Sequence, residues 1–104
     1  MRNKPIKKSS LFRILGPFEC VRNMDSIGRY SQVENQFILD FKNGRIYQSY
    51  NAIVAAFVKG KLYVNEFYHD YSNVTMKYCK AFTGMTAQQR RDGIKNGTIR
   101  TFEE

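Results

Sequence analysis

The sequence contains no tryptophan, only two cysteines, two prolines and a single histidine among its 104 residues. Cys20 and Cys79 lie far apart in the sequence and do not have the spacing of a zinc site or a disulfide framework. No run approaches the roughly 18 apolar residues that a membrane-spanning helix needs. No apolar run of the length found in a signal peptide follows the basic residues 1–10. We therefore expect a cytoplasmic protein with reduced thiols and no membrane contact.

Signatures of catalysis are also missing. His69 is followed by Asp70, but adjacent residues of an extended chain point to opposite sides, so they are poor partners in acid–base chemistry. Cys79 is predicted to lie in the middle of a helix, where nothing marks a stabilised thiolate. The glycines are scattered singly and form no phosphate-binding loop. The sequence therefore predicts a protein without catalytic residues, metal ligands or a cofactor.

Charge is plentiful and unbalanced. Seventeen Lys and Arg against nine Asp and Glu give a net charge of +8, and the excess lies in residues 1–25 and 71–104. Such a balance favours anionic partners, which include nucleic acid and acidic protein surfaces, although a surplus of charge can also serve solubility alone. Residues 1–10 are basic and polar and contain Pro5, so we expect a flexible arm before a single domain of residues 11–104.

The core is predicted in residues 36–66, which read as antiparallel strands. Asn43-Gly44 is typical of a type I′ turn, because both central positions of that turn need φ > 0. This turn places Phe41 opposite Ile46 and divides the side chains between two faces of the hairpin. One face carries Phe37, Leu39, Phe41, Ile46 and Tyr50, and the other carries Ile38, Asp40, Tyr47 and Ser49.

A second hairpin is predicted around Lys59-Gly60. A two-residue loop there would put Ala55, Phe57, Leu62 and Val64 on one face, while a longer loop is the alternative because Lys59 suits φ > 0 less well than Asn. Before the sheet, residues 11–22 indicate two strands separated by a turn at Gly16-Pro17, and residues 23–35 indicate a loop.

Two helices are predicted in the C-terminal third. The first is capped by Ser72 or Asn73, runs to about Thr83 and ends at Gly84. Its sheet-facing side is predicted to carry Val74, Tyr78, Ala81 and Met85. The second begins with a capping box of Thr86 and Gln89, runs to about Asn96 and ends at Gly97, and residues 98–102 are expected as a short edge strand. The predicted fold is α+β, with an antiparallel sheet of about four to six strands and both helices packed on one face.

Tyrosines offer a candidate binding surface. Five of the seven lie in the predicted sheet or just after it, where exposed rings would stack on unpaired bases or anchor a protein partner. The alternative is that they fill a half-buried sheet. Together with cations of the arm and of the helices, the candidate binding residues are Lys4, Lys7, Lys8, Tyr47, Tyr63, Lys77, Lys80, Arg90, Arg91 and Lys95.

Several short motifs resemble a family of small uncharacterised proteins from phages and other mobile elements, over about residues 37–102. They are Phe41 with Asn43-Gly44, Tyr47-Gln48-Ser49-Tyr50, Asp70-Tyr71-Ser72, Phe82-Thr83-Gly84 and Lys95-Asn96-Gly97. The resemblance implies a setting in which small proteins bind a host target, but it implies no activity.

The sequence leaves three hypotheses for the function. The first hypothesis is a non-enzymatic protein that occludes a host protein or a nucleic-acid-handling complex in the host cytoplasm, as an anti-CRISPR inhibitor does. The second is a protein that binds nucleic acid directly through the arm and the C-terminal helices. The third is a small enzyme, against which the missing catalytic signatures count.

Overall fold

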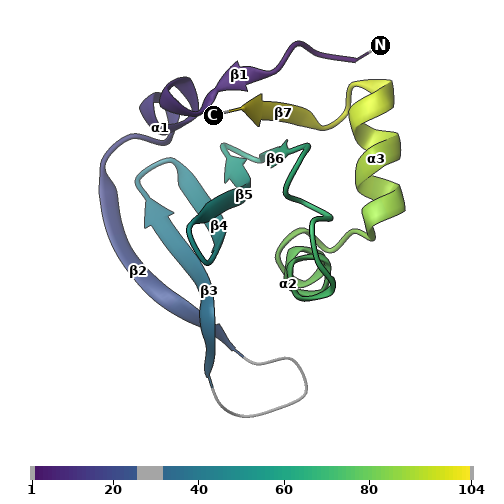
Figure 1. Cartoon of the computed structure of the whole chain (residues 1–104). Coiled ribbons are helices and arrows are strands. Elements are labelled where there is room, and N and C mark those ends of the chain that lie inside the picture. Colours follow the sequence, from purple (N-terminus) through teal and green to yellow (C-terminus); the bar gives the residue numbers. More distant parts are fainter. Residues whose placement is uncertain (1, 26–31, 104) are drawn as a thin grey trace.

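The protein is an α+β fold in which one seven-stranded sheet carries helices on both faces (Figure 1). The computed structural model describes residues 2–25 and 32–103. Its elements are β1 (Ile6–Lys7), α1 (Lys8–Leu15), β2 (Phe18–Asp25), β3 (Gln32–Phe41), β4 (Gly44–Ser49), β5 (Ala52–Val58), β6 (Lys61–Asn65), α2 (Asn73–Thr83), α3 (Ala87–Asn96) and β7 (Arg100–Glu103). No helix of the described ranges is long and apolar enough to cross a membrane.

The sheet is larger than predicted, and it is mixed. Its strand order is β1-β7-β6-β5-β4-β3-β2, and β7 runs parallel to both β1 and β6. The prediction of a purely antiparallel sheet of four to six strands is therefore wrong. The chain leaves β6, passes through α2 and α3 and returns beside β6, and a crossover of that length permits a parallel strand. Consequently β7 is not an edge strand, because β1 covers its outer side.

The N-terminal region differs most from the prediction. Residues 8–15 form a helix and not a strand, because Leu11 and Leu15 are spaced four apart and both are fully buried against the sheet. The basic residues that we expected in an arm include β1, which pairs with β7, and Lys8, the first residue of α1. Strand β2 extends to Asp25, into the predicted loop, while residues 26–31 of that loop lie outside the described residues.

The β3–β4 hairpin forms, but its turn is Lys42-Asn43 and Phe41 pairs with Gly44. The predicted Asn43-Gly44 turn is wrong because the end of α1 determines the geometry: the Asn43 backbone N–H donates to the Leu15 carbonyl at 2.9 Å. Gly44 is needed for close packing, since a Cβ there would lie 2.0 Å from the carbonyl oxygen of Phe57. The pairing differs by two residues from the prediction, so the predicted division between the two faces is preserved within β3 and β4. Tyr50 is the exception: it follows β4 in the turn to β5 and is exposed, so placing it on the face of Phe41 and Ile46 was wrong.

The β5–β6 hairpin matches the prediction. Lys59 and Gly60 form its two-residue loop with φ of 50° and 80°, as a type I′ turn requires, and Ala55 pairs with Val64. Lys59 tolerates the left-handed conformation although its side chain does not favour it.

Each sheet face has its own core. Ile38 and Tyr47 pack with the C-terminal helices, whereas Phe41 and Ile46 pack with α1.

Both C-terminal helices have the predicted caps: Ser72 and Gly84 for α2, and the Thr86–Gln89 capping box with Gly97 for α3. The buried side of α2 is carried by Thr75, Tyr78 and Cys79, while the predicted Val74 and Ala81 are exposed. Placing those two residues on the sheet side was wrong, because the buried side of α2 is rotated by about one residue from the side that the sequence predicted.

Candidate functional site

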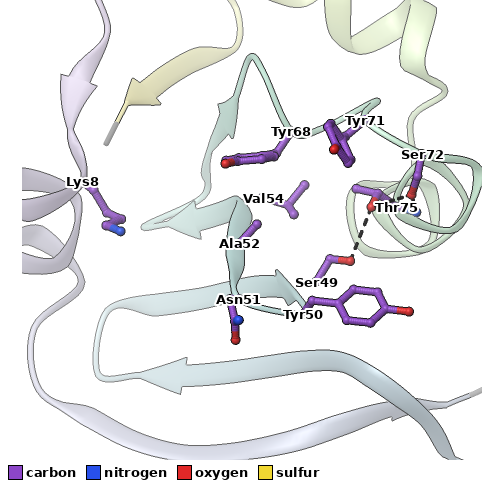
Figure 2. Close-up of a pocket in the computed structure, with 10 residues that line it drawn as sticks. All are labelled: Lys8, Ser49, Tyr50, Asn51, Ala52, Val54, Tyr68, Tyr71, Ser72 and Thr75. Atoms are coloured by element: carbon purple, nitrogen blue, oxygen red, sulfur yellow. Dashed lines mark hydrogen bonds between the residues drawn. The ribbon is translucent and has the colours of Figure 1, made fainter.

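An open groove of about 750 Å³ lies where β4 turns into β5, beside the loop of residues 66–72 that joins β6 to α2 (Figure 2). Its volume falls within the range of about 300–1,000 Å³ that is usual for ligand sites. We call it the tyrosine groove, because Tyr50, Tyr68 and Tyr71 line it.

Buried hydroxyl groups form the base of the groove. The Ser49 and Thr75 hydroxyl oxygens lie 3.4 Å apart, and the Ser72 hydroxyl donates to the Thr75 oxygen at 3.0 Å (Figure 2). Ser72 also accepts the Thr75 backbone N–H, so the residue that caps α2 belongs to the groove as well. These contacts join the end of β4 to the first turn of α2.

A β-bulge supplies the apolar part of the base. In the β4–β5 pair, Tyr47 is opposite Ala55 but Gln48 is opposite Ile53, so Val54 is the extra residue. The bulge brings both Val54 and Ala55 to the face of α2 and α3, and Val54 lines the groove. Bulges often redirect a side chain in this way next to a binding site.

Aromatic side chains form the wall. Tyr68 and Tyr71 line the groove, and Phe67, which lies outside its lining, contacts both rings, with the ring centroids 5.0–5.9 Å apart. The Asn65 side chain holds their backbone, because its Oδ1 accepts the N–H groups of Phe67 and Tyr68 at 3.0 and 3.2 Å. Asn65 is buried, so the wall is fixed from inside the protein.

Tyr50 stands at the rim in a strained conformation. Its φ is 53°, in the left-handed region that a tyrosine adopts at a cost of about 1 kcal/mol or more. The strain is held by two hydrogen bonds: the Tyr50 N–H donates to the Asn35 carbonyl at 2.7 Å, and the Gln48 side chain donates to the Tyr50 carbonyl at 2.7 Å. The ring is thereby held in an exposed position at the groove.

The lining of the groove is aromatic and hydroxyl-bearing, with little charge. Lys8 is its one charged lining residue, and no carboxylate or imidazole of the described residues lines it. What the groove offers is aromatic surface with hydroxyl donors and acceptors.

The other side of loop 66–72 faces α3 and is charged. Arg90, predicted as an exposed binding residue, is fully buried, so that prediction is wrong. Its Nε donates to Nδ1 of His69 at 3.0 Å, its Nη2 to the His69 carbonyl at 3.0 Å and its Nη1 to the Met85 carbonyl at 2.6 Å. Burial lowers the pKa of His69, and Arg90 and Arg91 add to this effect against Asp70 and Glu66. His69 is thus neutral, with Nδ1 as the acceptor.

The other predicted binding residues are dispersed. Tyr47 and Tyr63 are buried in opposite cores, so neither forms part of an exposed stacking surface. Of the cations, only Lys8 lines the tyrosine groove. The remaining ones are exposed on three parts of the fold: Lys4 and Lys7 at the N-terminal edge, Lys77 and Lys80 on α2, and Arg91 and Lys95 on α3.

The cysteines differ in environment. Burial raises the pKa of Cys79 to about 11, which keeps it a thiol. Cys20 is exposed on β2, where its hydrogen bond to Asp40 raises its pKa. Within residues 2–25 and 32–103, no group of three or more His, Cys, Asp or Glu is arranged to hold a metal ion.

Sequence reasoning missed the hydroxyl base of the groove. Ser49 and Thr75 are far apart in the sequence, and only the packing of α2 against β4 brings them together. Tyr50 and Tyr71 belonged to the tyrosines noticed in the sequence, but their exposure depends on the turn and the loop that hold them.

Comparisons with known proteins give a family but no function. No curated protein and no solved structure is similar enough to the chain to count as a match. Residues 21–97, which are more than half of the chain and include the groove except for Lys8, match a family of unknown function (DUF8033). The chain belongs to this family of unknown function.

Proposed function

We propose that this is a non-enzymatic binding protein that holds an extended segment of a protein partner in the tyrosine groove. The observation that carries the proposal is the gathering of exposed aromatic rings at one hollow. Tyr50 and Tyr71 line the groove and are 58% and 67% exposed, and Phe67, which is 68% exposed, packs against Tyr71 beside it. All three belong to backbone segments that hydrogen bonds fix. Rigid aromatic anchors of this kind dominate the binding energy of protein interfaces.

The lining indicates the chemistry of the partner. Its hydroxyls and tyrosines suit the main-chain groups and apolar side chains of a peptide, and the net charge of +8 favours one with acidic residues. Such a protein acts by stoichiometric occlusion of its target. A phage or mobile-element origin, a host target in the cytoplasm and an anti-defence role of the anti-CRISPR kind belong to this proposal.

Direct binding of single-stranded nucleic acid is the second candidate, because exposed tyrosines also stack on bases. The positions of the cations favour it less. A nucleic-acid groove usually follows the backbone with a row of Lys and Arg, whereas among residues 2–25 and 32–103 Lys8 is the one cation that lines the tyrosine groove.

The test is a pull-down from host lysate, with and without nuclease, using the wild type and a Tyr50→Asn/Tyr71→Ala double variant. We expect one protein at near-equal stoichiometry, retained after nuclease treatment and lost with the double variant. Phe18→Ala is the matched control, since Phe18 is an equally exposed ring (54%) on β2, away from the groove. Equal capture by the wild type and the double variant would reject the groove as the binding site.

Salt dependence separates the two candidates. A nucleic-acid complex loses affinity as salt rises, with a slope of about −0.7 per phosphate neutralised on a single strand or about −0.9 on duplex DNA. Binding of short DNA and RNA is measured at low salt by fluorescence anisotropy. We expect no saturable binding, and a steep slope that the double variant weakens would favour the second candidate.

A further inference from the structure

A second pocket, of about 400 Å³, lies between loop 66–72 and α3. Arg2, Glu66, His69, Asp70, Arg91 and Lys95 line it together with Ile94. We call it the basic pocket. It is separate from the tyrosine groove, with which it shares no lining residue.

The carboxylates of the basic pocket are already paired. Asp70 accepts a hydrogen bond from Arg91 at 2.8 Å, and Glu66 forms an ion pair with Arg2. Lys95 has no carboxylate within ion-pair distance in the part of the chain that the structure describes. One cation of the lining is therefore left without a counter-charge.

A second uncompensated charge lies directly behind the pocket. Arg90 is completely buried, and its three hydrogen bonds go to two backbone carbonyls and a neutral imidazole. A buried guanidinium is normally paired with a carboxylate, because neutral acceptors offset its lost hydration only in part. Arg90 and Lys95 together create a positive potential at this pocket that an anion would neutralise.

His69 provides a donor. It is 1% exposed, yet it lines the pocket, and its Nδ1 and carbonyl are both occupied by Arg90. Because Nδ1 accepts from Arg90, the ring proton is on Nε2. Among the described residues Nε2 has no hydrogen-bond acceptor, so its N–H is left for a group that enters the pocket.

We propose that the basic pocket binds the phosphate group of a small phosphate monoester. His69 Nε2 and Lys95 donate to its oxygens, and the buried charge of Arg90 stabilises its second negative charge. The volume exceeds that of a phosphate group alone, and Ile94 provides apolar surface for a small organic substituent. A dianion fits the two uncompensated cations better than a carboxylate with one charge does.

The experiment uses the only histidine of the chain as its probe. Inorganic phosphate, glycerol phosphate and acetate are each titrated into the ¹⁵N-labelled full-length protein, and the His69 ring signals are followed by NMR. We expect saturable shifts of the His69 ring signals with both phosphates, with a dissociation constant in the low millimolar range. This corresponds to a binding free energy of about −4 kcal/mol. Acetate is expected to produce a clearly weaker response.

Two variants locate the site. Lys95→Gln should weaken phosphate binding about tenfold, as expected for the loss of one charge-assisted hydrogen bond. Lys80→Gln is the matched control, because Lys80 occupies the last turn of α2 as Lys95 occupies that of α3. Neither change affects a buried group, so both variants are expected to fold.

Three results would overturn the proposal: an unshifted His69 at saturating phosphate, an equal loss in both lysine variants, or acetate binding as tight as phosphate. The proposal does not depend on the protein partner of the tyrosine groove. Loss of partner binding in the Tyr50→Asn/Tyr71→Ala variant would leave the phosphate result unchanged.

Discussion

The tyrosine groove and the basic pocket are two sides of one loop. Between β6 and α2, Tyr68, Tyr71 and Ser72 line the groove, whereas Glu66, His69 and Asp70 line the basic pocket. The groove exposes rings whose backbone is held by hydrogen bonds to Asn65 within the sheet, while the pocket side is tied to α3 through Arg90 and Arg91. A short segment thus presents two different chemistries, because the turns of residues 66–70 and the bend that follows direct side chains to both sides of the loop.

The largest expected effect comes from breaking the connection between the loop and α3. Arg90→Met removes three hydrogen bonds and leaves the buried carbonyl and Nδ1 of His69 without their donor, while the half-buried Met85 carbonyl keeps the Thr83 hydroxyl at 3.4 Å. We expect the free energy of unfolding to fall by about 2–4 kcal/mol, because each buried acceptor that loses its donor costs about 1–3 kcal/mol. Urea denaturation followed by circular dichroism measures the change.

Arg91→Met is the control for this prediction. Arg91 is half-exposed, and its ion pair with Asp70 should contribute at most about 1 kcal/mol. If both arginine variants lose the same stability, Arg90 is not the anchor of the loop. If Arg90→Met also weakens partner binding, the groove depends on the anchoring of its opposite side.

Tyr71→Ala tests the tyrosine groove, and its expected loss of affinity for the partner is the next largest effect. The ring is 67% exposed and contacts Phe67 and Tyr68, so its removal should change stability by less than about 0.5 kcal/mol. Affinity for the partner should fall by about 2 kcal/mol, or roughly 30-fold, as for an aromatic hot spot. Calorimetric titration of the identified partner measures this, and an affinity within a factor of two of the wild type would contradict the prediction.

Much of the region around both sites was predictable because local signals determine it. Ser72 and Gly84 begin and end α2, the Thr86–Gln89 box begins α3, and Lys59-Gly60 forms the expected turn. These features depend on residues within a few positions of one another, and hydrogen bonds within a single turn satisfy them.

What was missed depends on contacts between distant residues. The hairpin turn at Lys42-Asn43 is set by the end of α1, nearly thirty positions earlier, as the hydrogen bond from Asn43 Nδ2 to the Ile14 carbonyl illustrates. Arg90 was predicted to bind a partner because the sequence does not show that the hydrogen-bond acceptors on His69 and Met85 surround it in the fold. A run such as residues 11–15 fits a strand and a helix equally well by periodicity, and only packing against the sheet decides between them.

Tyr50→Asn sharpens the comparison because it moves stability and binding in opposite directions. Asn adopts φ near 53° with less strain than Tyr, so the variant should gain about 1 kcal/mol of stability while losing the ring that the partner contacts. Thermal unfolding and the same calorimetric titration measure the two changes. A variant that is both less stable and equally tight in binding would show that the strained ring is structural.

The smallest expected effect is a pH dependence confined to the basic-pocket side. Burial, together with Arg90 and Arg91, lowers the pKa of His69 against the opposing charges of Asp70 and Glu66. Below about pH 6.5 the unfolded chain takes up a proton that the native imidazole does not, so the unfolded state binds more protons and stability falls as pH falls. Between pH 7 and pH 6 the loss should be at most about 0.7 kcal/mol.

His69→Asn is the matched control, since the amide oxygen of Asn can still accept from Arg90 but does not titrate. The stability of this variant should therefore change less with pH over this range. An equal slope in both proteins would assign the pH dependence to other groups and leave the neutral, Nε2-protonated imidazole without support.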